Sequence, residues 1–366
     1  MATLADAGLT FTTLPHPSPA SAEQREAVLA NPGFGTNFSD HMVTVEWTEG
    51  QGWHDAVVGP RQPIALDPAA SVLHYAQEIF EGLKAYVQAD GSVALFRPEA
   101  NAARFNQSAQ RLAMPELPEA LFVEAIERLV KIDRAWIPAG EGASLYLRPF
   151  MIATEAFLGV RPAKQYKFIV IASPAGNYFK SGAPAVSIWV SDYTRAAPGG
   201  TGAAKCGGNY AASLVPQAEA ISRGHDQVVF LDAAEHKWIE ELGGMNLYFV
   251  FEDGTLLTPA LTGTILPGIT RDSLLQLARE EGLKVEEGKY SLDQWRDDAN
   301  SGKLIETFAC GTAAVVTSVG KVSGRDGEFT IGSGGPGQLT AKLKNRLVSI
   351  QRGEAADTHG WIRKVS

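Results

Sequence analysis

The sequence predicts a mixed α/β (α+β) protein with two domains. Its 366 residues are more than one hydrophobic core comfortably supports and enough for two. Strand-like and helix-like segments are mixed along the chain without strict alternation. The turn-rich segment 173–184 is the best candidate for a connection between the domains. We therefore expect an N-terminal extension, a small α/β domain, an interdomain loop and a large domain, over residues 1–30, 31–178, 179–189 and 190–366.

Hydrophobic patterning locates the individual elements. Short runs of β-branched and aromatic residues between turn residues predict strands over 41–47, 92–96, 143–153, 168–172, 186–190, 227–231, 247–251 and 303–309. Apolar residues at helical spacing predict helices over 99–111, 118–132, 210–223 and 271–282. Thr270 is placed as the N-cap of the last helix. Residues 1–30, rich in Ala, Pro, Ser and Thr, are expected to form a loose extension.

Composition restricts the class of partner. A hydrophobic content of 45% and a charged content of 20% are typical of a soluble globular protein. The formal net charge of -9 argues against nucleic acid and against an anionic membrane surface, both of which need basic patches. Small-molecule chemistry remains open. Because an acidic protein that binds anions must concentrate cations locally, individual arginines become of interest.

The cysteines and the N-terminus indicate a cytoplasmic protein. Two cysteines, Cys206 and Cys310, are too few for a disulfide framework. The first residues do not combine a basic region with an apolar run, so no signal peptide is expected. No apolar stretch approaches the ~20 residues of a membrane helix. The seven histidines show no metal-ligand spacing, so no metal site is expected.

The segment Gly202-Ala-Ala-Lys205-Cys-Gly-Gly-Asn-Tyr210 gives the clearest indication of chemistry. A lysine with a lowered pKa is the usual nucleophile for holding a carbonyl as a Schiff base. Glycines beside it let the backbone approach a flat ligand. The combination suggests an enzyme that stores pyridoxal 5'-phosphate (PLP) on Lys205, the alternative being a solvated surface lysine.

A phosphate site is indicated further along the chain. Pro267-Gly268 turns the chain into a helix N-terminus, where N–H groups and the helix dipole bind anions. Ile269 and Thr270 would supply backbone N–H groups, and Thr270 a hydroxyl as well. Gly311-Thr312 offers a second small turn and another hydroxyl.

Several segments together resemble branched-chain amino-acid aminotransferases, PLP enzymes of the fold-type-IV group that also contains D-amino-acid aminotransferases. They occur in the family's order between about Phe34 and Gln351. They are Tyr75-Ala-Gln-Glu-Ile-Phe-Glu-Gly-Leu-Lys-Ala-Tyr86, Ser144-Leu-Tyr-Leu-Arg-Pro149, Lys205-x-Gly-Gly-Asn-Tyr210, Glu241-Leu-Gly-Gly-Met-Asn246, Leu266-Pro-Gly-Ile-Thr-Arg271 and Gly311-Thr-Ala313. The long form of the family is indicated by the segments 33–47 and 154–160. The resemblance implies a two-domain, D-amino-acid-aminotransferase-like fold in which the large domain binds PLP.

The resemblance implies a role for each polar residue near the cofactor. Lys205 would form the Schiff base and then move a proton at the substrate α-carbon. Glu241 would pair with the pyridine nitrogen, and the register of the motif favours it over the neighbouring Glu240, which is expected to be solvated or structural. Tyr210 would bond the ring phenolate oxygen, the alternative being a buried tyrosine bonded to a backbone carbonyl.

The phosphate and substrate residues follow from the same resemblance. The phosphate would be held by Leu266, Ile269, Thr270 and Thr312, with Arg104 favoured over Arg97 and Arg111 as its charge partner. Arg148 would reach a distal carboxylate, and Tyr146 with Thr312-Ala313 would hold the α-carboxylate. Strand alternation puts Tyr146 and Arg148 on one face. The apolar wall would consist of Phe34, Tyr75, Phe80, Val160, Tyr193 and Tyr210, in part from a partner subunit, with ordinary core packing as the alternative for Phe34, Phe80 and Val160.

The implied activity is reversible amino transfer between Leu, Ile or Val and 2-oxoglutarate by a homodimeric, cytoplasmic enzyme. A D-amino-acid aminotransferase, an aminodeoxychorismate lyase or a non-catalytic PLP-binding protein are the alternatives. Mammalian members of the family carry a Cys-x-x-Cys redox pair after the Gly-Thr-Ala segment. Here those positions are Ala314 and Thr317, so no redox switch is expected, and both cysteines are interpreted as small apolar residues.

Overall fold

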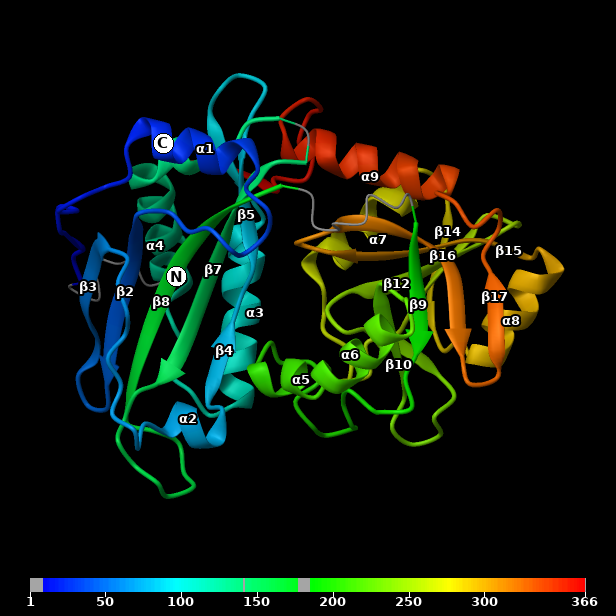
Figure 1. Ribbon diagram of the computed structural model, residues 1–366, viewed down its shortest axis with the longest axis horizontal. Helices are drawn as coiled ribbons and strands as arrows, with labels where there is room; N and C mark the ends of the chain where they lie inside the picture. Colours follow the sequence, from blue (N-terminus) through cyan, green and yellow to red (C-terminus); the bar gives the residue numbers. More distant parts are fainter. Residues whose placement is uncertain (1–8, 141, 177–184, 366) are drawn as a thin grey trace. The chain divides into compact units, whose positions relative to one another are not determined.

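The chain divides into two compact units. The computed structural model describes residues 9–140, 142–176 and 185–365. One unit is Met1–Tyr178 together with Ile350–Ser366, and the other is Phe179–Ser349 (Figure 1). Residues 177–184 of the predicted connection lie outside the described residues, and Val186–Val190 form strand β9. The domain boundaries given by the sequence stay a prediction, although the structure groups the residues from Ile350 onward with the first unit.

The first unit contains a sheet that is antiparallel except at one edge, where β1 pairs with β3 in parallel. The strand order is β1-β3-β2-β8-β7-β5-β6-β18, and β4 pairs with β7. Strand β18 pairs with β6, which explains why the C-terminal residues belong to this unit. The strands are β1 (Thr12–Thr13), β2 (His41–Thr48), β3 (Gly52–Pro60), β4 (Glu78–Phe80), β5 (Leu83–Val87), β6 (Val93–Phe96), β7 (Ser144–Ala153), β8 (Gln165–Ala175) and β18 (Ile362–Val365).

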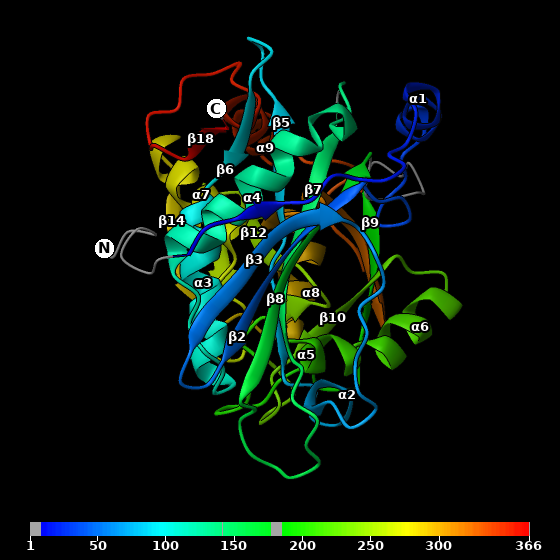
Figure 2. The ribbon, with the colours of Figure 1, turned by 90° about the vertical axis from the view of Figure 1, so that its left-hand side faces the viewer.

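Two long helices cover this sheet. Helix α3 packs on α4, and α4 packs on β2 and β8 (Figure 2). Phe105 of α3, Phe122 of α4 and Phe168 of β8 are fully buried, with ring centroids 5.3–5.9 Å apart. Burying each such side chain contributes about 1.5–3 kcal/mol. The helical elements are α1 (Ala22–Ala30), α2 (Ser71–Tyr75), α3 (Pro98–Arg111), α4 (Glu119–Ile132) and the 3-10 helix η2 (Arg134–Trp136).

The second unit contains a mixed sheet that closes on itself. Strand β11 pairs with both β10 and β12, so β11-β10-β9-β16-β15-β12 form a ring. Strand β13 pairs with β12, β14 pairs with β13 in parallel, and β17 pairs with β16. The strands are β9 (Val186–Val190), β10 (Gln227–Leu231), β11 (Ile239–Leu242), β12 (Asn246–Phe251), β13 (Thr255–Pro259), β14 (Lys284–Gly288), β15 (Leu304–Gly311), β16 (Val315–Gly324) and β17 (Gly327–Thr330).

The helices of the second unit correct two predictions. The single helix predicted over 210–223 is wrong: α5 (Gly207–Ala211) ends before α6 (Leu214–Ser222) begins. Pro216 lacks the N–H that a continuous helix would need at that position, which accounts for the break. Thr270 is not an N-cap, because α7 (Ile269–Glu280) begins one residue earlier and Gly268 is its N-cap. The remaining helices are α8 (Leu292–Ser301) and α9 (Gln338–Gln351).

The other expectations about elements can be compared directly. The predicted helices 99–111 and 118–132 are confirmed, each to within one residue at either end. All eight predicted strands are present as β2, β6, β7, β8, β9, β10, β12 and β15. The loose extension over 1–30 is wrong in part, because Ser21 and Gln24 form a capping box that starts α1. Within the described part of the chain, no helix combines the length and apolar character needed to cross a membrane.

Candidate active site

Lys205 lies at the entrance to α5, next to Tyr210. Its Nζ donates a hydrogen bond to the Tyr210 hydroxyl at 2.8 Å. The preceding loop is held by Asn209, whose side chain donates to the carbonyls of Thr201 and Ala204, both at 2.8 Å. The Lys205 amine is therefore positioned by a phenol on the first helical turn that follows it.

Glu241 is a buried carboxylate with several donors around it. It lies on β11 and is 3% exposed. Its Oε1 accepts from the Leu266 N–H at 3.0 Å, and its Oε2 accepts from the Asn246 amide at 3.2 Å. Burial raises the pKa of Glu241, and the adjacent Arg195 opposes that rise. The two donors and Arg195 favour the charged form of Glu241, whereas burial disfavours it.

Arg195 is a functional candidate that sequence reasoning missed. Its guanidinium donates to Glu241 and also to the carbonyls of Gly202 and Thr264, both at 3.2 Å. It is 7% exposed. The acidic composition suggests that arginines matter, but no spacing connects Arg195 with a glutamate on a distant strand. The tertiary fold brings the two together, because Arg195 follows β9 and Glu241 lies on β11, with β10 between these strands in the sheet.

The N-terminus of α7 lies beside Glu241. The Asn246 amide that bonds Glu241 also donates to the Leu266 carbonyl at 3.0 Å. A Cβ on Gly268 would lie 2.1 Å from Asn246 Oδ1, so a larger residue would push the Asn246 side chain away from Glu241. Ile269 and Thr270 begin the helix, and no side chain caps it at Gly268. A helix N-terminus of this kind attracts anions through its N–H groups and dipole.

The predicted Thr312-Ala313 turn follows β15 directly. Asn246 pairs in register with Glu241 on β11 and with Cys310 on β15. At Gly311, a Cβ would lie 3.3 Å from the Gly244 carbonyl oxygen. The structure thus places this turn beside the β11–β12 turn, next to Glu241 and Asn246.

Arg104 lies in the first unit, in a buried ion pair. Its Nε donates to Glu81 Oε1 at 2.7 Å and its Nη2 to Oε2 at 2.8 Å. Both side chains are buried, and Asn101 adds a third donor to the carboxylate. Of its two competitors, Arg97 stacks on Trp361 and Arg111 is exposed. The Glu81 carboxylate therefore fixes the orientation of the Arg104 guanidinium.

Four predicted substrate residues gather on the first unit. Arg148 Nη2 donates to the Tyr146 hydroxyl at 3.0 Å, which confirms that the two side chains share a face of β7. The Arg148 guanidinium lies 4.7 Å from the Phe80 ring centroid, and Phe34 meets Tyr146 edge-on at 5.1 Å. A Cβ on Gly82 would lie 2.2 Å from the Tyr146 hydroxyl, so glycine is required beside this cluster. A cation framed by aromatic rings is suited to a ligand with a carboxylate and an apolar chain.

Three other predicted substrate residues are exposed. Tyr75 is 41% exposed and donates a hydrogen bond to the Leu158 carbonyl. Val160 and Tyr193 are 87% and 51% exposed. Core packing is therefore not the role of Val160, although it stays an alternative for Phe34 and Phe80.

Two further expectations concern Glu240 and the cysteines. Of the two interpretations of Glu240, solvated or structural, the structure excludes the first: Glu240 is 6% exposed and accepts from Thr264 Oγ1 at 2.5 Å. Cys206 and Cys310 are both free and buried, in keeping with their interpretation as small apolar residues, and burial raises the pKa of the Cys310 thiol. No set of three or more potential metal ligands is found among residues 9–140, 142–176 and 185–365.

Comparison with known proteins places the chain in a family. The model of the amino-transferase class IV family matches residues 78–322. The chain belongs to this family. This aminotransferase is 58% identical over 363 residues to the branched-chain-amino-acid aminotransferase of Mycolicibacterium smegmatis, covering 98% of this chain and 99% of that protein. It is 57% identical over 362 residues to the enzyme of the same name from Mycobacterium tuberculosis H37Rv, covering 98% of each.

Solved structures agree with this assignment. The aminotransferase superposes on the branched-chain amino acid aminotransferase from Escherichia coli with a TM-score of 0.71 at 29% identity, covering 88% of this chain and 99% of that one. The T.th. enzyme of that name, solved with pyridoxamine 5'-phosphate, gives a TM-score of 0.72 at 29% identity, covering 88% and 98%. The fold is thus that of the fold-type-IV transaminases, which use PLP.

The residues present fit PLP. The Lys205 amine is held by a phenol, and the Glu241 carboxylate is buried with an arginine behind it. Helix α7 begins at a glycine where a Cβ would displace the Asn246 side chain. An amine for the aldehyde, an anion for the ring nitrogen and a helix N-terminus for the phosphate are the three groups that PLP requires.

Proposed function

We propose that this aminotransferase is a branched-chain-amino-acid transaminase that reversibly transfers the amino group of L-Leu, L-Ile or L-Val to 2-oxoglutarate. The observation that carries the proposal is the Lys205–Tyr210 hydrogen bond in the unit that also holds buried Glu241. The relatives at 57–59% identity over nearly the whole chain bear the same name, which supports the substrate class.

In the proposed mechanism, Lys205 is the catalytic residue. PLP, when bound, supplies the electron sink that stabilises charge at the substrate α-carbon. The Lys205 amine would take the proton from that carbon and deliver it to the cofactor C4′, with its direction set by the Tyr210 hydroxyl. Glu241 would pair with the ring nitrogen, and Arg195 favours the charged form of that carboxylate.

The remaining proposed contacts would hold the cofactor phosphate, the substrate carboxylates and the apolar side chain of the substrate. Leu266, Ile269, Thr270 and Thr312 would hold the phosphate through backbone N–H groups and hydroxyls, with Arg104 as the cation. Arg148 and Tyr146 would receive the substrate carboxylates, with Tyr146 and the Thr312-Ala313 turn at the α-carboxylate. Rings and aliphatic groups would line the apolar side, namely Phe34, Tyr75, Phe80, Val160, Tyr193 and Tyr210.

The proposal extends to assembly, location and domain organisation. Exposed apolar side chains such as Val160 and Tyr193 could be buried by packing against a second copy of the chain. We therefore propose a homodimer. Its sedimentation mass should be twice the 39.1 kDa of one chain. We also propose a cytoplasmic location and a two-domain organisation, a small domain over 31–178 and a large PLP-binding domain over 190–366 joined by the loop 179–189.

The experiment compares two amino donors and two lysines. Purified protein should transaminate L-leucine with 2-oxoglutarate and leave D-alanine unused. Lys205→Ala should abolish this turnover and the absorbance of the bound cofactor, whereas Lys344→Ala, at an exposed lysine of α9, should keep both. Turnover of D-alanine in place of L-leucine would identify a D-amino-acid aminotransferase, and an active Lys205→Ala variant would exclude the assigned role of this lysine.

A further inference from the structure

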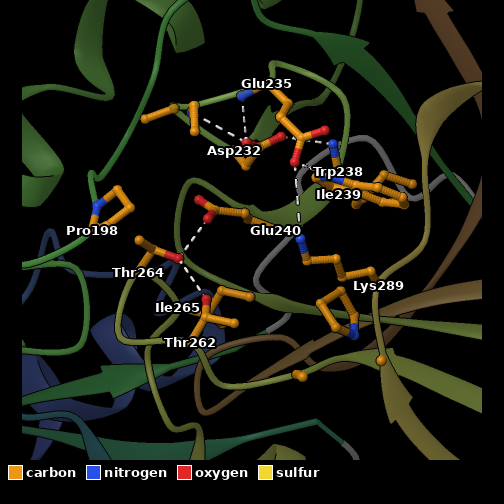
Figure 3. A pocket seen from close by; sticks show the side chains of 15 residues that line it. Pro198, Asp232, Glu235, Trp238, Ile239, Glu240, Thr262, Thr264, Ile265 and Lys289 are labelled. Carbon is orange, nitrogen blue, oxygen red and sulfur yellow. Dashed lines mark hydrogen bonds and ion pairs between the residues drawn. The ribbon is translucent and has the colours of Figure 1, made fainter.

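Glu240 and Thr264 form a buried contact behind the Glu241 carboxylate. Glu240 precedes Glu241 on β11, so the two side chains point to opposite faces of the strand. Thr264 Oγ1 donates to Glu240 Oε1 at 2.5 Å, and the Thr262 hydroxyl lies 3.0 Å from that of Thr264 (Figure 3). The mechanism above uses neither Glu240 nor Thr264.

Thr264 also contacts the Glu241 side of the strand. Its carbonyl accepts from Arg195 Nη2 at 3.2 Å, the guanidinium that pairs with Glu241. Two residues later, the Leu266 N–H donates to Glu241 Oε1 at 3.0 Å. The segment Thr264–Leu266 is thus bonded to both consecutive glutamates, and it leads directly into α7.

The residues around Glu240 leave the Thr264 hydroxyl as the group that orients its carboxyl. The pair lies in the wall of a pocket of about 190 Å³. The other charged groups there are engaged elsewhere: Asp232 accepts backbone N–H groups of its own turn, and Glu235 faces Lys289 and Trp238 (Figure 3). Glu240 Oε2 is buried with no hydrogen-bond partner in the described structure, so Thr264 is the group that orients the carboxyl. Burial and, more weakly, Asp232 raise the pKa of Glu240, whereas the Thr264 hydrogen bond and Arg195 lower it.

We infer that Glu240 and Thr264 are positioning residues for the cofactor site: by fixing the Thr264–Leu266 segment, they set the place and the charge of Glu241 and the start of α7. The inference rests on the proposed function, since it assigns what holds the PLP-binding groups in place. A carboxylate shifted relative to Arg195 and the Leu266 N–H would hold the ring nitrogen less well. The phosphate-binding helix would be less well fixed as well.

The test uses three hydroxyl variants of the holoenzyme. Thr264→Val removes the donor at nearly constant shape, Thr264→Ser keeps it, and Thr262→Val removes the neighbouring hydroxyl as a matched control. The quantities to measure are the rate of PLP release, the pH midpoint of the absorbance of bound PLP and the melting temperature of the apo-protein. Because a hydrogen bond to a carboxyl group is involved, Thr264→Val should release PLP about tenfold faster or more and shift the pH midpoint. Thr264→Ser and Thr262→Val should stay within about threefold of wild type.

A double-mutant cycle separates positioning from general loss of structure. If Glu240 and Thr264 act as a pair, Glu240→Leu combined with Thr264→Val should release PLP no faster than the more severe single variant. Glu240→Gln keeps an acceptor for Thr264 and should resemble wild type. The inference is overturned if Thr264→Val retains the wild-type release rate and pH midpoint, or if Thr264→Ser is as defective as Thr264→Val. Wild-type protein that binds no PLP would overturn the proposed function itself and this inference with it, whereas an active wild type beside an unaffected Thr264→Val overturns the inference alone.

Discussion

Arg195 connects three segments of the candidate active site in the second unit. It donates to Glu241 and to two backbone carbonyls, one before Lys205 and one before α7. A guanidinium suits this place because its donors form a rigid fork and it remains charged when buried. The Lys205 loop, the Glu241 strand and the α7 loop are thereby tied to a single side chain.

Replacing Arg195 by Met should destabilise the protein in a pH-dependent manner. Burial already raises the pKa of Glu241, and loss of Arg195 removes the main group that opposes the rise. An acid with a raised pKa in the folded state contributes stability at low pH that is lost as pH rises through that pKa. Relative to wild type, Arg195→Met should therefore lose little near pH 5 and about 3–5 kcal/mol near pH 8, measured by denaturant unfolding. An equal loss at both pH values would contradict this account.

At the residue scale, the sequence predicted what local spacing determines. Tyr146 and Arg148 alternate on one strand, and the two side chains are in contact as expected. The hydrogen bond between Lys205 and Tyr210, five residues apart, was not itself predicted. The Arg195–Glu241 pair and the burial of Glu240 depend on tertiary contacts between segments distant in sequence, which no local pattern encodes.

At the scale of elements, close backbone approaches position the candidate site. A Cβ on Gly202 would lie 2.4 Å from the Thr264 carbonyl oxygen, so the loop before Lys205 packs directly on the loop before α7. A Cβ on Gly208, in contrast, would meet nothing within 4 Å. The two glycines of one segment therefore have different roles.

Gly202→Ala and Gly208→Ala form a matched pair of variants. Gly202→Ala should lower the free energy of unfolding by about 1–3 kcal/mol, because a backbone oxygen has to move. Gly208→Ala lies in α5, where alanine is favoured, and should be neutral or stabilising by up to about 1 kcal/mol. Denaturant unfolding of the two apo-proteins measures the difference. Equal stabilities would show that the loops are not in the contact described.

Strand β5 contributes a second pH dependence through Lys84. Burial, with a smaller contribution from Arg352, lowers its pKa from 10.5 to about 8. Between these values the unfolded chain binds a proton that the folded protein does not, so stability rises with pH. From about pH 8 to 10.5, wild type should gain about 1.4 kcal/mol per pH unit relative to Lys84→Met. Parallel stability curves for the two proteins would contradict the lowered pKa.

Strand and helix patterns were predicted well where hydrophobic periodicity is strong, as in α3, α4 and β8. Predictions failed where a single residue decides the boundary. Pro216 divides the predicted helix 210–223, and the extended backbone at Gly268 starts α7 before Thr270. The capping box that begins α1 was legible in the sequence and was missed among the prolines and serines around it.

At the scale of the whole molecule, the two units supply different parts of the proposed chemistry. The second holds Lys205, Tyr210, Glu241 and the start of α7. The first holds the cluster of Arg148 with Phe34, Phe80 and Tyr146. The return of the C-terminal strand to the first unit was not predicted, because the pairing of β18 with β6 joins residues far apart in sequence.

Substrate selectivity is a property of the assembled enzyme. An apolar pocket discriminates one methylene by only ~1–3 kcal/mol, so Leu, Ile and Val should have similar specificity constants. Steady-state kinetics with each amino donor and 2-oxoglutarate measures this. A specificity constant for one of these amino acids a thousandfold above the others would contradict selection by apolar contacts alone.

The central claim is that the amine of Lys205 carries the cofactor. Treatment of the holoenzyme with borohydride, followed by peptide mapping, tests it most directly. We predict a single phosphopyridoxyl label on the peptide that contains Lys205. A label on a different lysine, or no label on protein that turns over L-leucine, would contradict the claim.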